Sequence, residues 1–167
     1  MKKLLPLICL LIFAGCQQQQ NGSGYLRWIG DAVADPVLDS EEFQLCYDEK
    51  RVMQYFNFSS GLQYEGEKKA LVRRFNETYV APQSTQSGWI RIRFIVNCQG
   101  EAGRFRLISS DENYQEQAFD SVITDQLLTI TKSLDGWSSQ PIDKKPKDYY
   151  QYLVFKIKNG VITEILP

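Results

Sequence analysis

The stretch GWIRIRFIVNCQGEAGRFRLIS, residues 88–109, predicts a β-hairpin at the centre of the fold. In its first half, apolar residues alternate with aromatic and basic ones, which is the two-residue period of a half-buried strand. Residues 97–100 have the composition of a turn, and the alternation resumes after them through Ile108. The two alternating segments should therefore pair as neighbouring antiparallel strands.

The alternation also assigns the two faces of this hairpin. The apolar phase of the first strand is expected to face the core and comprises Ile90, Ile92, Phe94 and Val96. Trp89, Arg91 and Arg93 then point to the opposite face, because successive side chains of a strand alternate. The same alternation turns Arg104 and Arg106 outward on the second strand.

A later alternating segment, residues 149–158, adds to this outward face. If its apolar phase faces the core, its outward residues are Tyr150, Tyr152, Lys156 and Lys158. The candidate binding residues are therefore Arg91, Arg93, Arg104, Arg106, Tyr152 and Lys156. Arginine and tyrosine are enriched where interfaces carry binding energy. Three interpretations stay open for the face: ordinary solvated surface, a surface covered by an acidic segment of the same chain, or the binding site of an acidic partner.

Helical periodicity flanks the hairpin on both sides. Leu71, Val72, Phe75 and Tyr79 share one face of a helix predicted over residues 66–79. After the hairpin, Asn113 followed by Glu116 has the pattern of an N-cap with its capping-box partner. An apolar stripe then runs over some twenty residues, and Gly136 is expected to end this second helix.

The chain closes on a second predicted hairpin. Asn159-Gly160 lies between the alternating segments 149–158 and 161–166, which is a strong short-range hairpin signal. The order is thus helix, strand, strand, helix, strand, strand. It predicts an α+β two-layer domain with an antiparallel sheet of about three to four strands and two helices on one face.

The segment before this domain, residues 25–62, is predicted to be an N-terminal extension, which we call the strap. It contains Pro36 and many acidic residues, which suggest an extended course. Short strands are expected near residues 43–46 and 51–56.

The first residues have the pattern of a targeting segment. Lys2 and Lys3 precede an apolar run, residues 4–14, which is shorter than the roughly 20 residues that a membrane-spanning helix needs. The run ends in FAGC, residues 13–16, which resembles the lipobox of bacterial lipoproteins. The resemblance implies cleavage before Cys16 and diacylation of that residue; the alternative is an ordinary secretory signal.

The resemblance divides the chain into a signal peptide (1–15), a flexible tether (16–24), the strap (25–62) and the folded domain (63–167). Gln17 is not the aspartate that retains some lipoproteins at the inner membrane. The rule of that family therefore favours an outer-membrane anchor, with the protein facing the periplasm.

Two cysteines remain once Cys9 has left with the signal and Cys16 carries lipid. Cys46 and Cys98 form an even pair in an oxidising compartment, which favours a disulfide between them. The alternative is two buried free thiols, which behave as small hydrophobic residues.

The composition excludes several classes of function. The chain contains no histidine, which removes the commonest general base and metal ligand. It has no nucleophile-elbow, phosphate-loop or C-x-x-C motif. Without Lys2 and Lys3 it carries 17 basic and 20 acidic residues, which does not favour binding to nucleic acid. We expect no catalytic residue, no metal site and no cofactor.

Residues 64–167 resemble the C-terminal domain of TonB-type energy transducers. The resemblance rests on YEGEKKAL (64–71), the hairpin 88–110, and Trp137 after the second helix. It implies the TonB C-terminal fold, which in that family binds a short peptide of outer-membrane receptors by adding it to the sheet as a strand.

The start of the chain departs from the transducers. They have an uncleaved membrane helix and a long proline-rich spacer, whereas this chain has a lipoprotein-like signal and a tether of only eight residues, 17–24. The expectation is a lipid-anchored, non-catalytic binding module without energy transduction. Its partner would be a peptide or an envelope protein such as an outer-membrane transport protein. The alternative is an accessory envelope lipoprotein that binds cell-wall polymer or a neighbouring subunit.

Overall fold

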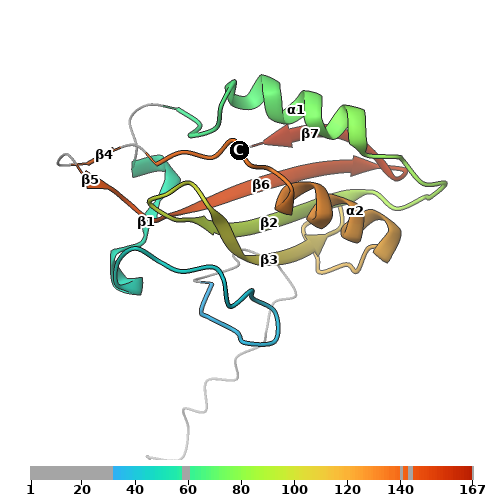
Figure 1. Cartoon of the computed structure of the whole chain (residues 1–167). Coiled ribbons are helices and arrows are strands. Elements are labelled where there is room, and N and C mark those ends of the chain that lie inside the picture. The colour runs from blue at the N-terminus through green and yellow to red at the C-terminus, as the bar shows by residue number, and fades with distance from the viewer. Residues whose placement is uncertain (1–31, 58–60, 140, 143–144, 167) are drawn as a thin grey trace, which may run out of the picture.

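The computed structural model describes residues 32–57, 61–139, 141–142 and 145–166, and it confirms the α+β class (Figure 1). Its helices are α1 (Glu67–Thr78) and α2 (Ser121–Lys132). Its strands are β1 (Met53–Gln54), β2 (Gly88–Val96), β3 (Ala102–Ser110), β4 (Pro141–Ile142), β5 (Lys145–Pro146), β6 (Tyr149–Lys158) and β7 (Val161–Leu166). The expected signal peptide, Cys16 and tether lie outside the described residues. Among the residues that are described, none of the helices combines the length and the apolar character needed to cross a membrane.

The main sheet has five strands, more than the three or four expected, and it is mixed. Its order is β1-β6-β2-β3, and β7 also pairs with β6. β7 runs antiparallel to the second half of β6, while β1 pairs in parallel with Tyr149 and Tyr150 at its start. A strand of two residues is too short to show any hydrophobic period, which is why the sequence did not predict the pairing of β1.

The predicted hairpin is confirmed. β2 and β3 pair in antiparallel register, with Trp89 opposite Ser110 and Arg93 opposite Arg106. The register shifts between Arg93 and Ile95, where Arg104 adopts a φ of 54°. This is a β-bulge, in which an extra residue on one strand increases the local twist.

Both helices pack against one face of the sheet, which we call the inner face. Phe75 of α1 lies edge-to-face on Phe155 of β6, with ring centroids 4.8 Å apart. From α2, Ile123 and Leu127 enter the same core. The expected apolar phase of β2 is fully buried there: Ile90, Ile92, Phe94 and Val96. Figure 1 shows the first described residues of the strap, which begin at Ala32, on the opposite side of the sheet from α1.

The second helix is shorter than predicted, and Asn113 is not its N-cap. The helix begins at Ser121, and the preceding segment folds back on β3 through a bridge between Ser110 and Glu116. The Asp111 carboxylate accepts the N–H groups of Asn113 and Gln115, both at 2.8 Å. Hydrogen bonds from a side chain to the nearby backbone compete with the backbone hydrogen bonds that would begin a helix here.

The predicted end of this helix was also wrong, because the helix stops at Lys132 with Ser133 as its C-cap, short of Gly136. In the strap, residues 43–46 form no strand. Within 51–56 the only strand is β1, which lies between two 3-10 helices, Glu49–Arg51 and Tyr55–Asn57. Between α2 and β6, the strands β4 and β5 pair as a short antiparallel ribbon. The first helix, in contrast, lies within one residue of its predicted bounds at either end.

Candidate functional site

The candidate site is the outer face of the sheet, on the side away from the helices. Arg93, Arg104 and Arg106 lie in the half of this face that the strap covers. Arg91 and Lys156 lie in the other half, and Tyr152 lies at the boundary. The contacts of the covered half show how the strap is bound to this surface.

Arg106 forms a two-point ion pair with the strap. Its Nη1 lies 2.7 Å from Asp39 Oδ1, and its Nη2 lies 2.8 Å from Asp39 Oδ2. Nη2 also donates to the carbonyl of Val33 at 2.7 Å. The hydrogen bond from Arg106 lowers the pKa of Asp39 and raises the pKa of Arg106 itself. Fork-like pairs of this kind are the strongest form of charged hydrogen bond.

Arg104 makes a second, more exposed contact with the strap. Its Nη1 donates to Glu49 Oε1 at 2.8 Å and to the carbonyl of Ala32 at 3.3 Å. The Glu49 side chain is 55% exposed, whereas that of Asp39 is only 10% exposed. This pair should therefore contribute less to stability than the Arg106 pair.

Arg93 is fully buried at the centre of the sheet. Its guanidinium carbon lies 3.9 Å from the centroid of the Tyr150 ring and 4.7 Å from that of Tyr152. Its Nη2 donates to Gln54 Oε1 of β1 at 3.4 Å. Arg93 is thus enclosed by cation–π and polar contacts within the molecule.

A small apolar cluster lies beneath the strap. Ala32, Ile95 and Tyr150 are buried together, and Phe43, Leu45 and Val52 of the strap pack against them. The Phe43 ring lies so close to the backbone of Gly103 that a Cβ at that position would overlap it.

Asp148 and a disulfide fasten the strap to the turn of the hairpin. The Cys46–Cys98 disulfide is present, as the sequence predicted. The buried carboxylate of Asp148 accepts the N–H of Tyr47 at 2.9 Å and the N–H of Cys98 at 2.8 Å. The Asp148 carbonyl accepts the N–H of Met53 at the start of β1, also at 2.9 Å.

Cys46, Cys98 and Asp148 also lie close enough together to resemble the ligands of a metal site. The ligand atoms of Cys46, Cys98 and Asp148 lie within 4.8 Å of one another. Both sulfurs are joined in the disulfide, so neither is a thiolate that could hold a metal ion. The arrangement is that of a structural clamp.

The other half of the outer face lies away from the contacts that strap residues 32–57 make with the sheet, and for that reason alone we call it the open half-face. It consists of Trp89, Arg91, Ile108, Tyr114, Val154 and Lys156. The strap's hydrogen bonds and ion pairs with the sheet, in the part of the chain that is described, fall at the opposite end. Trp89 and Tyr114 stack with centroids 5.8 Å apart and an angle of 12° between their planes. Arg91 lies 5.6 Å from the Tyr114 centroid, and Lys156 lies 5.2 Å from that of Trp89. These residues form a cationic and aromatic platform.

The position of Tyr114 depends on an unusual turn. Its φ is 63°, a left-handed conformation that a bulky residue rarely adopts. Its N–H donates to the carbonyl of Asp111 at 3.1 Å, which closes the turn and brings the ring over β2. Backbone strain of this kind is concentrated at functional sites.

Both cations of the open half-face have local contacts. Nη1 of Arg91 donates to Ser110 Oγ at 3.4 Å. Lys156 lies opposite Glu164 in the register of β6 and β7, and both side chains are exposed. The Arg91 contact is longer than the two bonds between Arg106 and Asp39.

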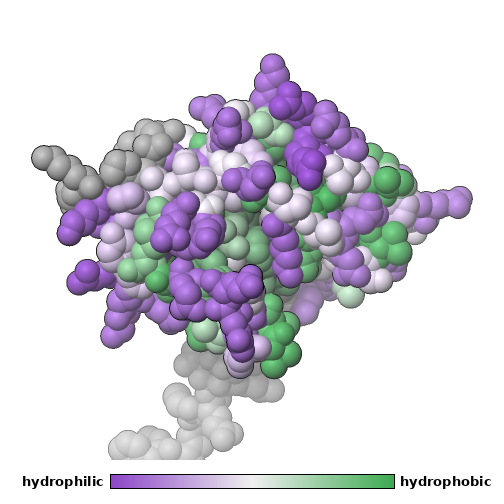
Figure 2. Space-filling model, viewed as in Figure 1, coloured by the Kyte–Doolittle hydropathy of each residue, from purple (hydrophilic) through white to green (hydrophobic). Residues whose placement is uncertain are grey.

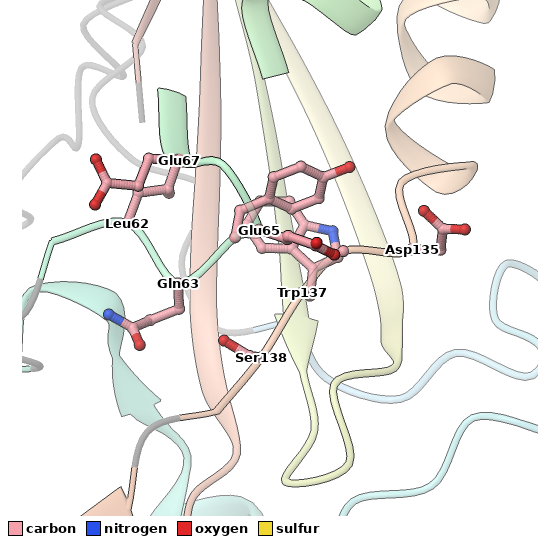
Figure 3. A pocket seen from close by; sticks show the side chains of 9 residues that line it. Leu62, Gln63, Glu65, Glu67, Asp135, Trp137 and Ser138 are labelled. Carbon is pink, nitrogen blue, oxygen red and sulfur yellow. The ribbon is translucent and has the colours of Figure 1, made fainter. Parts of the chain in front are cut away.

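A separate depression of about 390 Å³ lies where the chain enters α1 and leaves α2 (Figure 3). Tyr64 packs edge-to-face on Trp137 in its wall, with centroids 4.8 Å apart. Burial, with a smaller contribution from Asp135, raises the pKa of Tyr64. Figure 3 shows the Glu67 and Asp135 carboxylates at opposite sides, so they do not converge as an acid–base pair.

Comparison with protein-family models, curated proteins and solved structures found no match to this chain. The assignment of a function therefore rests on the sequence and on the geometry of the outer face.

Sequence reasoning placed all six candidate residues on one face but did not identify which of them the strap covers. It did not find Tyr114 in this site, because that residue was assigned to a helix. It also did not find Asp148 or Gln54, whose positions follow from contacts between distant segments. The one available signal for Tyr114 was Asp111 two residues before Asn113, a local arrangement typical of turns.

Proposed function

We propose that this protein is a non-catalytic binding module of the bacterial cell envelope, held by lipid on Cys16 at the outer membrane and facing the periplasm. Its open half-face binds an acidic segment of an envelope protein, such as an outer-membrane transport protein. The TonB-like order of elements supports a binding role. The short tether and the lipoprotein-like signal argue against energy transduction.

One observation carries this proposal. On the covered half, arginines of the sheet already bind an acidic segment of the same chain, through Asp39 on Arg106 and Glu49 on Arg104. The open half-face presents Arg91 of β2 and Lys156 of β6 on the same face of the sheet, beside two stacked aromatic rings. A partner with carboxylates would find there the chemistry that the strap finds on the covered half.

Site-specific photocrosslinking in cells tests the proposal. A benzophenone amino acid at Tyr114 should crosslink to an envelope protein, and replacing Arg91 and Lys156 with glutamine in that background should reduce the yield. The matched control is the same label at Asn76, an exposed residue of α1 on the other side of the sheet. Equal yields at the two positions, or a yield unaffected by the glutamine variants, would contradict the proposed site.

The stacked pair of Trp89 and Tyr114 favours a second candidate, binding of cell-wall glycan. Sugar rings pack their C–H faces on aromatic rings, and this pair provides a flat aromatic surface. Retention of the protein on purified cell-wall sacculi should then fall in Trp89→Ala and Tyr114→Ala. Retention that depends on neither ring would remove this candidate.

A further inference from the structure

The strap carries a short run of exposed apolar residues. Val33 is 66% exposed, Val37 is 89% exposed and Leu38 is 61% exposed. Ala34 and Pro36 between them are exposed as well. Exposed apolar side chains are normal when they are scattered singly, but a contiguous run marks a surface with a partner.

This run, residues 33–38, is held in a defined shape without burying its own apolar side chains. The Asp35 carboxylate accepts the N–H of Val37 at 2.9 Å, and the Asp35 carbonyl accepts the N–H groups of Leu38 and Asp39. The N–H of Asp35 donates to Asp39 Oδ2 at 2.8 Å, and Asp39 is held by Arg106. The turn is therefore fixed from beneath by polar contacts, while its valines and leucine point into solvent.

The other exposed large apolar side chains of the described chain belong to different elements: Phe56, Val80, Tyr114, Val122 and Val161. Figure 2 shows hydrophobic surface at the lower edge of the molecule, where Figure 1, from the same side, places the first described residues of the strap.

The run also lies close in sequence to the proposed anchor. Val33 lies 17 positions after Cys16, and a chain of that length spans at most about 60 Å. A bilayer that holds the lipid lies within reach of residues 33–38.

The charges around the run indicate which lipid surface it fits. The Asp35 carboxylate accepts backbone N–H groups within the turn but keeps its negative charge, and the charge of Asp39 is paired with Arg106. Glu41 and Glu42, just beyond it, are exposed. A zwitterionic membrane surface therefore suits the run better than a strongly anionic one.

We propose that residues 33–38 form a membrane-contact loop, which places its valine and leucine side chains in the interface of the bilayer that holds the anchor. The contact adds apolar burial to the lipid chains and fixes the orientation of the domain. The strap side of the sheet then faces the membrane, and α1 faces away from it. This inference rests on the proposed anchor at Cys16.

The test uses the full lipidated protein in phosphatidylcholine vesicles, with an environment-sensitive fluorophore on a single introduced cysteine. Val37→Cys is the test position. Val80→Cys, whose native residue is 73% exposed at the end of α1, is the matched control. The native Cys46 and Cys98 are oxidised and do not react. The label at 37 should shift to the blue on vesicles and be quenched by lipids spin-labelled near the headgroup, and the label at 80 should do neither.

Whether the protein floats with the vesicles shows separately whether the lipid anchor holds it to the membrane. Protein that floats while its label at 37 emits as in water would overturn the membrane-contact loop and leave the anchor intact. Protein that does not float would overturn the anchor, and the membrane-contact loop with it. Replacing Val33 and Leu38 with serine should reduce the blue shift at 37, and an unchanged shift would contradict a role for these side chains.

Discussion

The two halves of the outer sheet face are built from the same strands and the same alternation, yet they are used differently. On the covered half, Arg93, Arg104 and Arg106 are occupied by strap or sheet residues, and the strap is fastened by Asp148 and a disulfide. On the open half-face, Arg91 and Lys156 lie over aromatic rings. The same sequence pattern is therefore bound by the strap at one end of the face, and in the proposed function it binds a partner at the other.

The largest expected effect follows from breaking the covalent link between the strap and the hairpin. Replacing both Cys46 and Cys98 with alanine should lower the free energy of unfolding by about 4 kcal/mol, because the disulfide closes a loop of some 50 residues. Urea denaturation of the variant and the parent protein measures this. A loss below about 1 kcal/mol would mean that the strap is held almost entirely by its non-covalent contacts.

Removing the Asp39 carboxylate should have the next largest effect. Asp39→Asn leaves the half-buried guanidinium of Arg106 without its anion and should cost about 2 kcal/mol at neutral pH. The pH dependence checks the cause. The pKa of Asp39 is lowered in the folded protein, so its stabilisation is present above the unfolded value of 3.8 and is lost as the pH falls through the lower folded value.

The difference in stability between the parent protein and Asp39→Asn should therefore shrink between pH 5 and pH 2. Thermal melts of both proteins across that pH range measure this difference in stability. A difference that stays constant with pH would show that the carboxylate acts through packing rather than through its charge.

Glu49→Gln should have a small effect, because more than half of the Glu49 side chain is in solvent. We expect a loss of at most about 0.5 kcal/mol, which added salt reduces further. Urea denaturation at low and high salt measures it. A loss as large as that of Asp39→Asn would contradict the ranking of the two strap contacts.

The sequence predicted the main strands and the first helix well, because apolar residues recur in them at the regular spacing of a strand or a helix. The alternation over 88–109 located β2, β3 and their inward residues, and the spacing of Leu71 and Phe75 located α1. The Asn159-Gly160 turn between β6 and β7 followed from two residues with strong local preferences.

What the sequence did not predict depends on contacts between distant segments. The pairing of β1 with β6 joins two residues to a strand almost a hundred positions later. The division of the outer face depends on where the strap docks, which is set by Phe43 on Gly103 and by Asp148 on the backbone of Tyr47. The first residues of the predicted second helix instead form a turn that is held by the Asp111 carboxylate. The apolar stripe that predicted the helix contains no information about these local hydrogen bonds.

A paired comparison of Arg106→Gln with Arg91→Gln tests the division of the outer face most directly. Each variant is measured for melting temperature and for the yield of the crosslink from position 114. Arg106→Gln should lower the melting temperature by several degrees and keep the crosslink. Arg91→Gln should leave the melting temperature nearly unchanged and lose most of the crosslink. Equal effects of the two variants on both measurements, or the reverse assignment, would contradict the division into a structural half and a binding half.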